Sequence, residues 1–217
     1  MNRKGLFITI EGGEGAGKST AVELIQARFQ QASIPLVCTR EPGGTALGEQ
    51  LRDLLLTPRD TDIDSLAELL MMFAARAQHL SELVRPALER GQCVLCDRFT
   101  DASYAYQGWG RGLGSDSVSV LEKLVQGGLQ PDATLLLDVS PEVGLARARG
   151  RAALDRFERE DIAFFERVRA AYLHRAEKLA GRYWIVDANR ELASVKIQLH
   201  KHLDELIEKY AVTFDER

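Results

Sequence analysis

Cysteines and long apolar runs are both scarce in this sequence, and each shortage excludes a class of protein. The 217 residues include three cysteines, an odd count that argues against a disulfide framework and predicts a reducing, cytoplasmic setting. No apolar stretch approaches the length of a membrane-spanning helix, and the run after Gly5 is too short for a signal-peptide core. We therefore expect no membrane partner.

An excess of charge of one sign is also missing. The chain carries 28 Lys and Arg residues against 32 Asp and Glu residues, which gives a formal net charge of −4. A protein with this balance has no basic field that would draw it to nucleic acid or to an anionic membrane. We expect no nucleic-acid partner, and any phosphate that the protein binds must be held by a few local groups.

Metal-ligand spacings are scarce as well. Cys93 and Cys96 have the spacing of a redox or zinc motif, but they lie in an apolar run with no second Cys or His pair nearby. Because an unpaired cysteine behaves as a small hydrophobic residue, we predict that both are buried in a strand. His79 and the three other histidines show no ligand spacing with carboxylate or cysteine partners, so we expect no metal role for them.

The sequence does contain a regular alternation of short apolar runs and longer helical stretches. The runs have four to six residues and no polar alternation, as expected for strands buried on both faces of a parallel sheet; they lie at 6–10, 36–39, 93–96, 134–139 and 183–186. The alternation predicts right-handed β-α-β crossovers. We therefore expect an α/β fold, a three-layer α/β/α sandwich with a five-stranded parallel sheet, in a single domain of residues 1–217.

The expected helices separate these strands. Besides one after Lys18 and one at the C-terminus, they lie around 45–56, 64–90, 115–127, 141–150 and 158–180. Pro86 should kink or break the helix at 64–90, and Gly91 is placed to end it. The segment 108–114 has four glycines in seven residues and is expected to be a mobile loop.

Residues 12–19 read Gly-Gly-Glu-Gly-Ala-Gly-Lys-Ser and match the phosphate-binding pattern G-x-x-x-x-G-K-[ST] without a mismatch. Glycines allow the backbone to form a cup of N–H donors, and the helix that follows points its positive end at the phosphates. Lys18 can reach the β- and γ-phosphates, and Ser19 can ligate Mg²⁺. We expect a fold of P-loop NTPase type that binds ATP through Gly12, Gly13, Glu14, Gly15, Ala16, Gly17, Lys18, Ser19 and Thr20.

The P-loop identifies the phosphoryl donor and leaves the acceptor open. A guanine-reading N-K-x-D element is absent from the sequence, which argues against a GTPase switch. Polar residues also follow the other apolar runs, at 40–42, 97–98, 138 and 187. Ligands of parallel sheets gather at the carboxyl ends of the strands, so these residues are expected to form one site with the P-loop.

Five segments, in their order and spacing, resemble bacterial thymidylate kinase across essentially the whole chain. They are residues 10–20, Thr-Arg-Glu-Pro-Gly-Gly-Thr at 39–45, Phe-Ala-Ala-Arg-Ala-Gln-His at 73–79, residues 97–108 and the arginine-rich stretch 147–159. The resemblance implies ATP-dependent phosphorylation of dTMP to dTDP with Mg²⁺ as the cofactor, and a helical lid at approximately 142–160. It also implies a homodimer, for which the apolar face around 69–77 is a candidate interface.

The same resemblance implies roles on the acceptor side. Arg98 grips the acceptor monophosphate, a task for which a planar guanidinium is suited. Arg76 donates to O4 of thymine, where cytosine would present an amine, and Ser103 and Gln107 read the edge of the ring. Asp97 either holds Mg²⁺ through water or orients Arg98, and the sequence leaves both open.

Other implied contacts concern the face of the base and the sugar. Phe73 is expected to stack on the base, although Met72 takes the usual aromatic position of the family in a gapless alignment. Tyr104 and Tyr106 are expected to wall the sugar pocket. The remaining acceptor contacts implied are Glu14, which meets the deoxyribose 3′-hydroxyl, Glu41 and Arg52.

The P-loop carries no arginine at its variable positions. Lineages of the resembled family with such a loop deliver a catalytic arginine from the lid. We therefore expect Arg149 and Arg151 to act in catalysis beside Lys18 and Arg98. The alternative is a solvated helix whose arginines are balanced by neighbouring carboxylates.

Two other functions fit parts of the sequence. One is a nucleotide kinase with a different acceptor, such as dUMP, another monophosphate or an unphosphorylated deoxynucleoside. The other is a P-loop protein that binds a nucleotide as a regulatory switch. A switch needs no second nucleotide site, so the acceptor residues Arg76, Arg98 and Gln107 favour the kinase.

Overall fold

The computed structural model describes residues 5–150 and 155–215, of which 209–215 are described by their backbone alone. Five parallel strands form one sheet in the order β2-β3-β1-β4-β5. They are β1 (Phe7–Gly12), β2 (Leu36–Arg40), β3 (Cys93–Asp97), β4 (Ala133–Asp138) and β5 (Tyr183–Asp187). The predicted parallel sheet is confirmed, with each strand close to its predicted run.

The register of the strands brings polar residues from distant parts of the chain to one edge of the sheet. Asp97 at the end of β3 pairs with Ile10 of β1 and with Arg40 of β2. Asp138 at the end of β4 pairs with Asp187 of β5. The carboxyl ends of all five strands therefore lie at the same end of the sheet, where the P-loop follows β1, as the sequence predicts.

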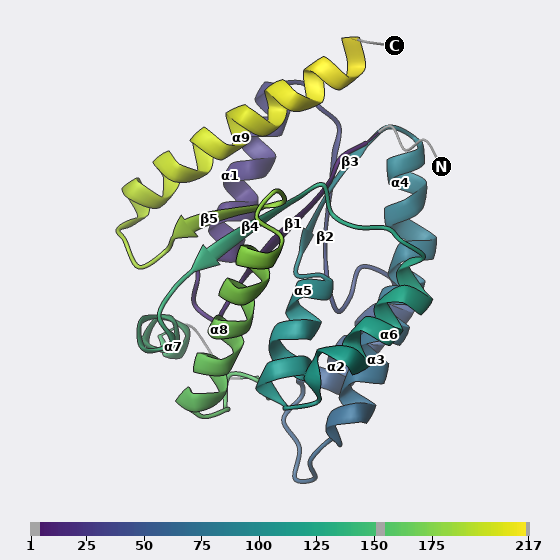
Figure 1. Cartoon of the computed structure of the whole chain (residues 1–217), viewed down its shortest axis with the longest axis vertical. Helices are drawn as coiled ribbons and strands as arrows, with labels where there is room; N and C mark the ends of the chain where they lie inside the picture. The colour runs from purple at the N-terminus through teal and green to yellow at the C-terminus, as the bar shows by residue number, and fades with distance from the viewer. Residues whose placement is uncertain (1–4, 151–154, 216–217) are drawn as a thin grey trace.

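Helices cover both faces of the sheet and make the three predicted layers (Figure 1). On one face α1 (Lys18–Gln31) and α9 (Leu192–Asp215) share an apolar core with the strands, to which Ile25, Phe29 and Leu199 contribute. On the other face lie α8 (Ile162–Lys178) and α4 (Arg85–Glu89). The predicted sandwich is confirmed.

Three helices lie together beyond the carboxyl ends of β2 and β3, at the lower right of Figure 1. They are α2 (Ala46–Leu56), α3 (Ser65–His79) and α6 (Gly114–Gln126). The side chain of Thr45 caps α2 by accepting from the N–H of Gly48, and the side chain of Asp64 caps α3. Such caps satisfy N–H groups that a helix cannot pair internally, so both helices begin at defined residues.

The helix predicted at 64–90 is broken, as its proline suggests. After α3 the chain forms one π-helical turn, η1 (Leu80–Val84), and then the short α4. Pro86 has no N–H to donate back along the helix, and a wider turn accommodates that loss. Gly91 follows α4 at φ +80°, a conformation that glycine adopts freely.

The glycines of segment 108–114 were predicted to form a mobile loop, and this prediction is wrong for its first half. α5 (Thr100–Ser103) continues into a π-helix, η2 (Tyr104–Gly110), in which Gly108 and Gly110 are buried. A Cβ atom at Gly110 would lie 2.7 Å from the ring of Phe164 in α8. Glycine therefore serves close packing here. A short turn, residues 111–113, then leads into α6.

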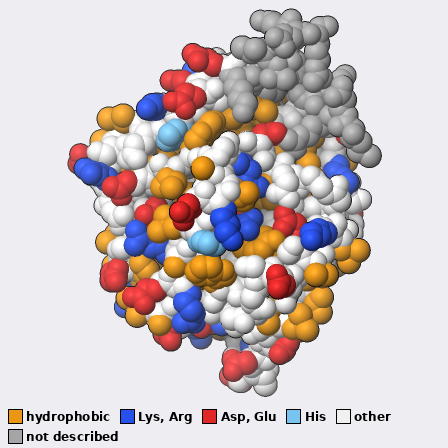
Figure 2. Space-filling view, viewed as in Figure 1, with side chains coloured by type: hydrophobic (Ala, Val, Ile, Leu, Met, Phe, Trp, Pro, Cys, Tyr) orange, Lys and Arg blue, Asp and Glu red, His pale blue; other side chains and the backbone are white. Residues whose placement is uncertain are grey.

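Cys93 and Cys96 are both buried in β3 and free of disulfides, as predicted. Among the residues that the structure describes, no helix is both long and apolar enough to cross a membrane. Lys and Arg side chains are interspersed with Asp and Glu side chains over the face seen in Figure 2. That pattern agrees with the nearly balanced charge of the chain.

Candidate active site

The P-loop follows β1 and needs glycine at two positions. Gly12 has φ +145°, and a Cβ atom there would lie 2.5 Å from the carbonyl oxygen of Leu137. Gly15 has φ +68°, and a Cβ atom there would lie 1.9 Å from the carbonyl oxygen of Gly144. The loop is thus pressed against β4 and against α7 (Pro141–Arg149), which follows β4. Thr20 is exposed on the first turn of α1.

Lys18 points back into the loop that precedes it. Its Nζ atom lies 3.3 Å from the carbonyl oxygen of Gly12 and 3.2 Å from that of Gly13. Burial and then the charge of Arg98 lower the pKa of Lys18, while the carboxylates of Glu14 and Asp97 act in the opposite direction. The ammonium group is therefore held where a phosphate could replace carbonyl oxygens as its partner.

A cavity of about 200 Å³ opens beside the P-loop. Loop residues 14–19 form one side of it, and the ends of β2 and β3, with α2, α3 and α5, form the other. Of the residues predicted for the acceptor, those that line it are Glu14, Glu41, Arg52, Arg76, Arg98, Ser103 and Gln107. The tertiary structure therefore brings the donor loop and most of the predicted acceptor residues to one cavity.

Arg76 is buried in this wall, and two of its three side-chain nitrogens have hydrogen-bond partners there. Its Nε atom donates to Glu41 at 2.7 Å, and its Nη2 atom donates to the Ser103 hydroxyl at 3.0 Å. The third nitrogen, Nη1, is buried without a hydrogen-bond partner in the described part of the chain. Leaving a buried donor unpaired is costly, so this atom points to a ligand that accepts a hydrogen bond.

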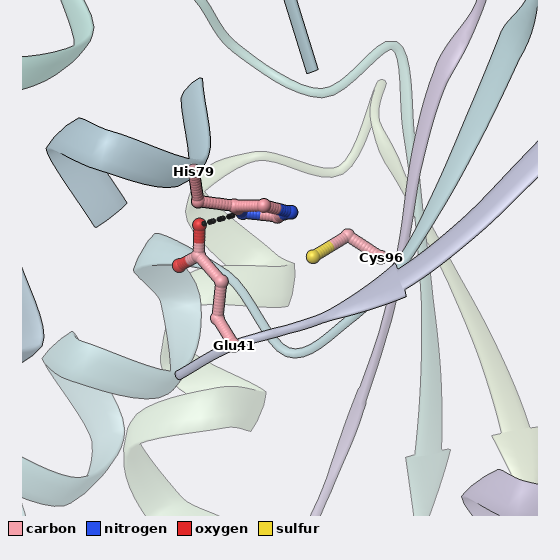
Figure 3. A group of neighbouring side chains, drawn as sticks. All are labelled: Glu41, His79 and Cys96. Carbon is pink, nitrogen blue, oxygen red and sulfur yellow. Dashed lines mark hydrogen bonds and ion pairs between the residues drawn. The ribbon is translucent and has the colours of Figure 1, made fainter. Parts of the chain in front are cut away.

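Glu41 is held by a second partner from the end of α3. Its carboxylate accepts from His79 Nδ1 at 2.8 Å (Figure 3). On the other side of the ring, His79 Nε2 lies 2.7 Å from the Thr39 hydroxyl. Although burial alone would raise the pKa of Glu41, the charge of Arg76 and the bond to His79 lower it. The carboxylate is therefore ionised and fixed in direction.

Cys96 completes this cluster of side chains, whose ligand atoms lie within 4.8 Å of one another (Figure 3). The sequence shows no ligand spacing that links His79 to a carboxylate or a cysteine, but β2, β3 and α3 bring Glu41 and Cys96 close to it in space. Burial raises the pKa of Cys96 well above its usual value, and its thiol donates to the carbonyl of Arg98. Both ring nitrogens of His79 are engaged. The cluster is a hydrogen-bonded support for Glu41.

Arg98 occupies the sharp turn after β3. Its φ of +66° is unusual for a residue with a side chain and marks a functional constraint. Its guanidinium donates to the carbonyl of Gly12 at 2.9 Å and to Glu14 at 2.5 Å. Burial alone would lower the pKa of Arg98, but the facing Tyr106 and Glu14 raise it well above its ordinary value. A permanent positive charge therefore lies between the P-loop and the acceptor wall.

Sequence reasoning missed the groups that hold this turn. Glu11, which precedes the P-loop, accepts from the N–H of Phe99 at 2.7 Å and from the hydroxyl of Tyr172 at 2.7 Å. Burial, with the charge of Asp101, raises the pKa of Glu11 to about 8. Glu11 directly follows the apolar run predicted as the first strand, and a lone carboxylate between that run and the P-loop was the signal that could have found it.

The placement of two predicted aromatic contacts differs from expectation. Phe73 is 2% exposed and packs with Leu69 and Tyr104, while its neighbour Met72 lines the cavity. Successive residues of a helix point about 100° apart, and here Met72 faces the cavity while Phe73 faces the apolar cluster with Val118 of α6. Of the two residues considered for the contact with the base, Met72 therefore lines the cavity wall and Phe73 does not.

Tyr104 also points away from the cavity. Its hydroxyl donates to Glu122 of α6 at 2.5 Å, and the guanidinium of Arg175 lies 3.7 Å from the centre of its ring. Burial and the contact with Glu122 raise the pKa of Tyr104 to about 12. Tyr106 lines the cavity and donates to Glu14 at 2.8 Å. Of the two tyrosines expected at the sugar, the structure thus brings only Tyr106 to the site.

Two oxygen-bearing side chains in the cavity wall could hold a divalent cation. Ser19 lies at the start of α1, and Asp97 ends β3 on the facing side. The Oδ1 atom of Asp97 is buried and has no hydrogen-bond partner in residues 5–150 and 155–215. Hydroxyl and carboxylate oxygens are the donors that Mg²⁺ prefers, so this pair fits the expected metal.

The arginine-rich stretch does not act as one group. Arg147 donates to the carbonyl of Ala188 at 2.8 Å, and Arg149 is exposed at the end of α7. Arg156 donates to the carbonyl of Leu55 and to Glu68. Arg151 lies outside the described residues, so the structure gives no account of that predicted catalytic residue.

Two carboxylates near the arginine-rich stretch were also missed. Asp155 and Glu158 line the cavity together with Phe157. In the sequence both residues were considered only in the alternative of a solvated helix, as carboxylates that balance the arginines. Residues 156–159 form a turn, in which the N–H of Glu158 donates to Asp155 at 2.9 Å, so a helical spacing could not have found these residues.

Known proteins similar to this chain have one description in common. The family model described as "Thymidylate kinase" matches residues 10–199. Thymidylate kinase of Teredinibacter turnerae is 57% identical over 200 residues, 92% of this chain and 98% of that protein. Thymidylate kinase of Pseudomonas syringae pv. tomato is 55% identical over 94% of this chain and 97% of its own. A crystal structure of thymidylate kinase from Ehrlichia chaffeensis matches with a TM-score of 0.74 and 32% identity, over 92% of this chain and 98% of that one.

Proposed function

Because the chain belongs to the thymidylate kinase family, whose members phosphorylate dTMP to dTDP with ATP, we propose that the cavity beside the P-loop is where the two substrates meet. The observation that carries this assignment is the unpaired, buried Nη1 atom of Arg76 in the cavity wall. A regulatory switch would not account for a buried, unpaired donor in the cavity wall, and cytosine, which presents an amine in place of O4, would not pair with that donor. Three free cysteines agree with a reducing, cytoplasmic setting.

On the donor side, Lys18 exchanges its carbonyl partners for oxygens of the transferring phosphate. Ser19 and Asp97 are the residues that would hold Mg²⁺, Asp97 through its unpaired oxygen or an intervening water. A cation bound by them would supply neutralising charge for the β- and γ-phosphates. Asp97 either binds the metal or orients Arg98. Metal binding is favoured, because Gly12 and Glu14 already hold Arg98 in place.

On the acceptor side, Arg98 receives the monophosphate. The phosphate competes with Glu14 for the guanidinium, and Glu14, so released, becomes available to the 3′-hydroxyl of the sugar. Met72 packs on the base, and Arg52 and Glu41 complete the wall. The acceptor oxygen is already anionic, so the transfer needs positioning and positive charge and no general base.

Residues 142–160 act as a lid that supplies a further cation through Arg149 or Arg151. Its first helix is already in contact with the P-loop, since Gly144 packs against the carbonyl of Glu14. Arg147 is tied to Ala188, whereas Arg149 at the end of α7 is exposed and available. Closure of the lid would exclude water and protect ATP from hydrolysis until dTMP is seated.

Replacement of Arg76 by Lys is expected to lower kcat/KM for dTMP by about 10²-fold, the scale of a lost charge-assisted hydrogen bond in a buried site. Lysine keeps a positive charge beside Glu41 but cannot hold Glu41, Ser103 and the base with one planar group. The ratio of dTMP to dCMP turnover should fall, because cytosine offers an amine where thymine offers O4. Steady-state kinetics of ADP formation with dTMP, dUMP and dCMP measure both effects.

ATP binding provides the control for this substitution. The affinity for ATP should change little in Arg76→Lys, since Arg76 contacts no P-loop residue. Equal losses for ATP and dTMP would mean that Arg76 has only a structural role. Uracil shares the O4 and N3–H edge of thymine, so turnover of dUMP should fall in parallel with that of dTMP.

A homodimer is proposed to form through the outer surfaces of α3 and α6. Leu66 and Leu70 are each 49% exposed on α3, and Ala74 and Ala77 continue the same helical stripe. On the adjacent α6, Val120 and Leu124 are 66% and 77% exposed. The stripe overlaps the predicted face at 69–77 but excludes its buried members. An exposed apolar surface of this kind is typical of an interface.

The substitution Leu124→Glu is expected to convert a dimer into a monomer, because it buries a charge if the interface forms. Sedimentation velocity of the wild type and the variant measures the mass of each. Ile197→Glu is the matched control, since Ile197 is 71% exposed on α9, which covers the other face of the sheet. A monomeric wild type, or equal effects of both substitutions, would contradict the proposed interface.

A further inference from the structure

Glu68 is a fully buried carboxylate outside the cavity wall. It lies in the first turn of α3, is 0% exposed and is held by three partners from two other segments. Gln107 Nε2 donates to its Oε1 atom at 2.7 Å, and Arg156 Nη2 donates to its Oε2 atom at 2.5 Å. Arg111 forms an ion pair with it at 3.3 Å. Burying a charged side chain costs free energy, so the contacts of Glu68 call for a functional explanation.

One of these contacts reaches the substrate cavity. Gln107 is 1% exposed and lines the cavity, whereas Glu68 does not. An ionised carboxylate can only accept hydrogen bonds, so the amide NH₂ group of Gln107 must be the end that faces Glu68. The carbonyl oxygen Oε1 is then the polar atom of Gln107 that remains for a ligand. The amide orientation therefore follows from Glu68.

We propose that Glu68 is a specificity-positioning residue, which fixes the amide of Gln107 so that its carbonyl oxygen accepts a hydrogen bond from N3–H of the base. The inference rests on the proposed function, in which the base lies in this cavity. Arg76 Nη1 supplies an unpaired donor in the same wall, so the wall offers one donor and one acceptor. Thymine presents O4 and N3–H to such a pair, whereas cytosine presents an amine and an unprotonated N3.

Glu68 by itself disfavours the opposite orientation of the Gln107 amide. If the amide of Gln107 rotated, its carbonyl oxygen would face the carboxylate, and its NH₂ group would face the base. That arrangement would place a donor opposite the unprotonated N3 of cytosine. One of the two contacts that distinguish thymine from cytosine would then be lost. The charges around Glu68 are balanced, because Arg111 also pairs with Glu160 at 2.5 Å, which gives two guanidinium groups for two carboxylates. The guanidinium groups of Arg111 and Arg156 thus face Glu68 from one side and hold its carboxylate beside the amide of Gln107.

Glu68 also anchors the C-terminal part of the proposed lid, residues 142–160. Arg156 donates to Glu68 and, through Nε, to the carbonyl of Leu55 at 2.8 Å, and its own N–H bonds the carbonyl of Leu56 at 3.0 Å. Its neighbours Asp155 and Phe157 line the cavity. The same carboxylate thus holds the base-reading amide and one wall of the cavity.

The test is the ratio of kcat/KM for dTMP to kcat/KM for dCMP in Glu68→Gln. Glutamine has nearly the same shape but can donate as well as accept, so it no longer dictates the orientation of Gln107. We expect the ratio to fall by about tenfold, chiefly through a higher KM for dTMP. A lower folded fraction would reduce both rates equally and leave the ratio unchanged, so the ratio separates positioning from instability.

A double-mutant cycle with Gln107→Met distinguishes an action through Gln107 from a general structural effect. In the Gln107→Met background, Glu68→Gln should change the ratio no further. If Glu68→Gln does not fold, Glu68→Asp keeps the charge for the two arginines but is too short to hold the amide, and the same fall is expected. An unchanged ratio in the folded variant, or an equal fall in both backgrounds, would overturn the inference.

Failure of this inference differs from failure of the proposed function. If the base does not bind in this cavity, Gln107→Met and Arg76→Lys will both leave the dTMP to dCMP ratio unchanged. If only the role of Glu68 is wrong, those two variants will change the ratio and Glu68→Gln will not. Arg156→Lys serves as a neighbour control: it leaves the contact between Glu68 and Gln107 and should keep the wild-type ratio.

Discussion

Replacement of Lys18 by Met is expected to lower kcat for dTDP formation by about 10³-fold, the scale on which loss of one preorganised electrostatic group acts. Lys18 is the cation that the P-loop itself carries, and its Nζ atom is held 3.2–3.3 Å from the carbonyl oxygens of Gly13 and Gly12. Methionine has a similar length and apolar stem, so packing is largely kept while the charge is lost. Rates of ADP and dTDP formation at saturating ATP and dTMP measure the effect.

Two further variants, measured in the same assay, are needed to interpret this result. Lys201→Met removes an exposed lysine from α9 and should leave kcat unchanged. Arg149→Ala tests the proposed lid in the same assay and should lower kcat by about 10²-fold, with little change in the melting temperature. A kcat for Lys18→Met within tenfold of the wild type would contradict the assignment of the P-loop lysine to the transferring phosphate.

Replacement of Arg98 by Lys is expected to lower kcat/KM for dTMP by about 10²- to 10³-fold. The guanidinium lies between the P-loop and the acceptor wall and bonds both Gly12 and Glu14. Lysine keeps one positive charge but not the planar fork that can bond two phosphate oxygens. Both residues carry a Cβ atom, so the strain of the positive φ at this turn is the same in the two proteins.

The neighbouring residue provides a matched contrast for Arg98. Asp97→Asn should raise the Mg²⁺ concentration needed for half-maximal activity while the KM for dTMP stays near the wild-type value. Arg98→Lys should do the opposite, with a raised KM for dTMP and an unchanged requirement for Mg²⁺. If the two variants change the same parameter, the division between metal-binding Asp97 and phosphate-binding Arg98 is wrong.

The architecture was predictable because its signals are local. Apolar runs of strand length, separated by helical stretches, located all five strands, and Pro86 marked the break after α3. Periodicity did not reveal that α5 continues as a π-helix. The wider turns of η2 allow Tyr106 and Gln107 to reach the cavity and turn Tyr104 away from it. Gly110 suggested a loop, because a glycine that permits close packing against α8 looks the same in the sequence as a glycine that makes a loop flexible.

The candidate site was predictable where its residues are contiguous and unpredictable where it is assembled from distant segments. Gly12–Ser19 form one pattern with one physical purpose, and the turn at Arg98 is a short motif after a strand. The pair of Glu41 with His79, and the group of Glu68 with Gln107 and Arg156, join residues that are about 40 to 90 positions apart. No spacing rule links such residues, because each lies on a different element.

The sequence by itself determined that this protein has a P-loop at the carboxyl end of a parallel sheet, and its resemblance to a known family implied the acceptor residues. The P-loop and the sheet depend on backbone conformation and on strand and helix periods, which neighbouring residues set. The tertiary structure decided which side chains face the cavity: Met72 and not Phe73, Tyr106 and not Tyr104, and one free nitrogen of Arg76. That choice depends on the rotation of each helix against its neighbours and on the partners that burial forces each polar atom to find.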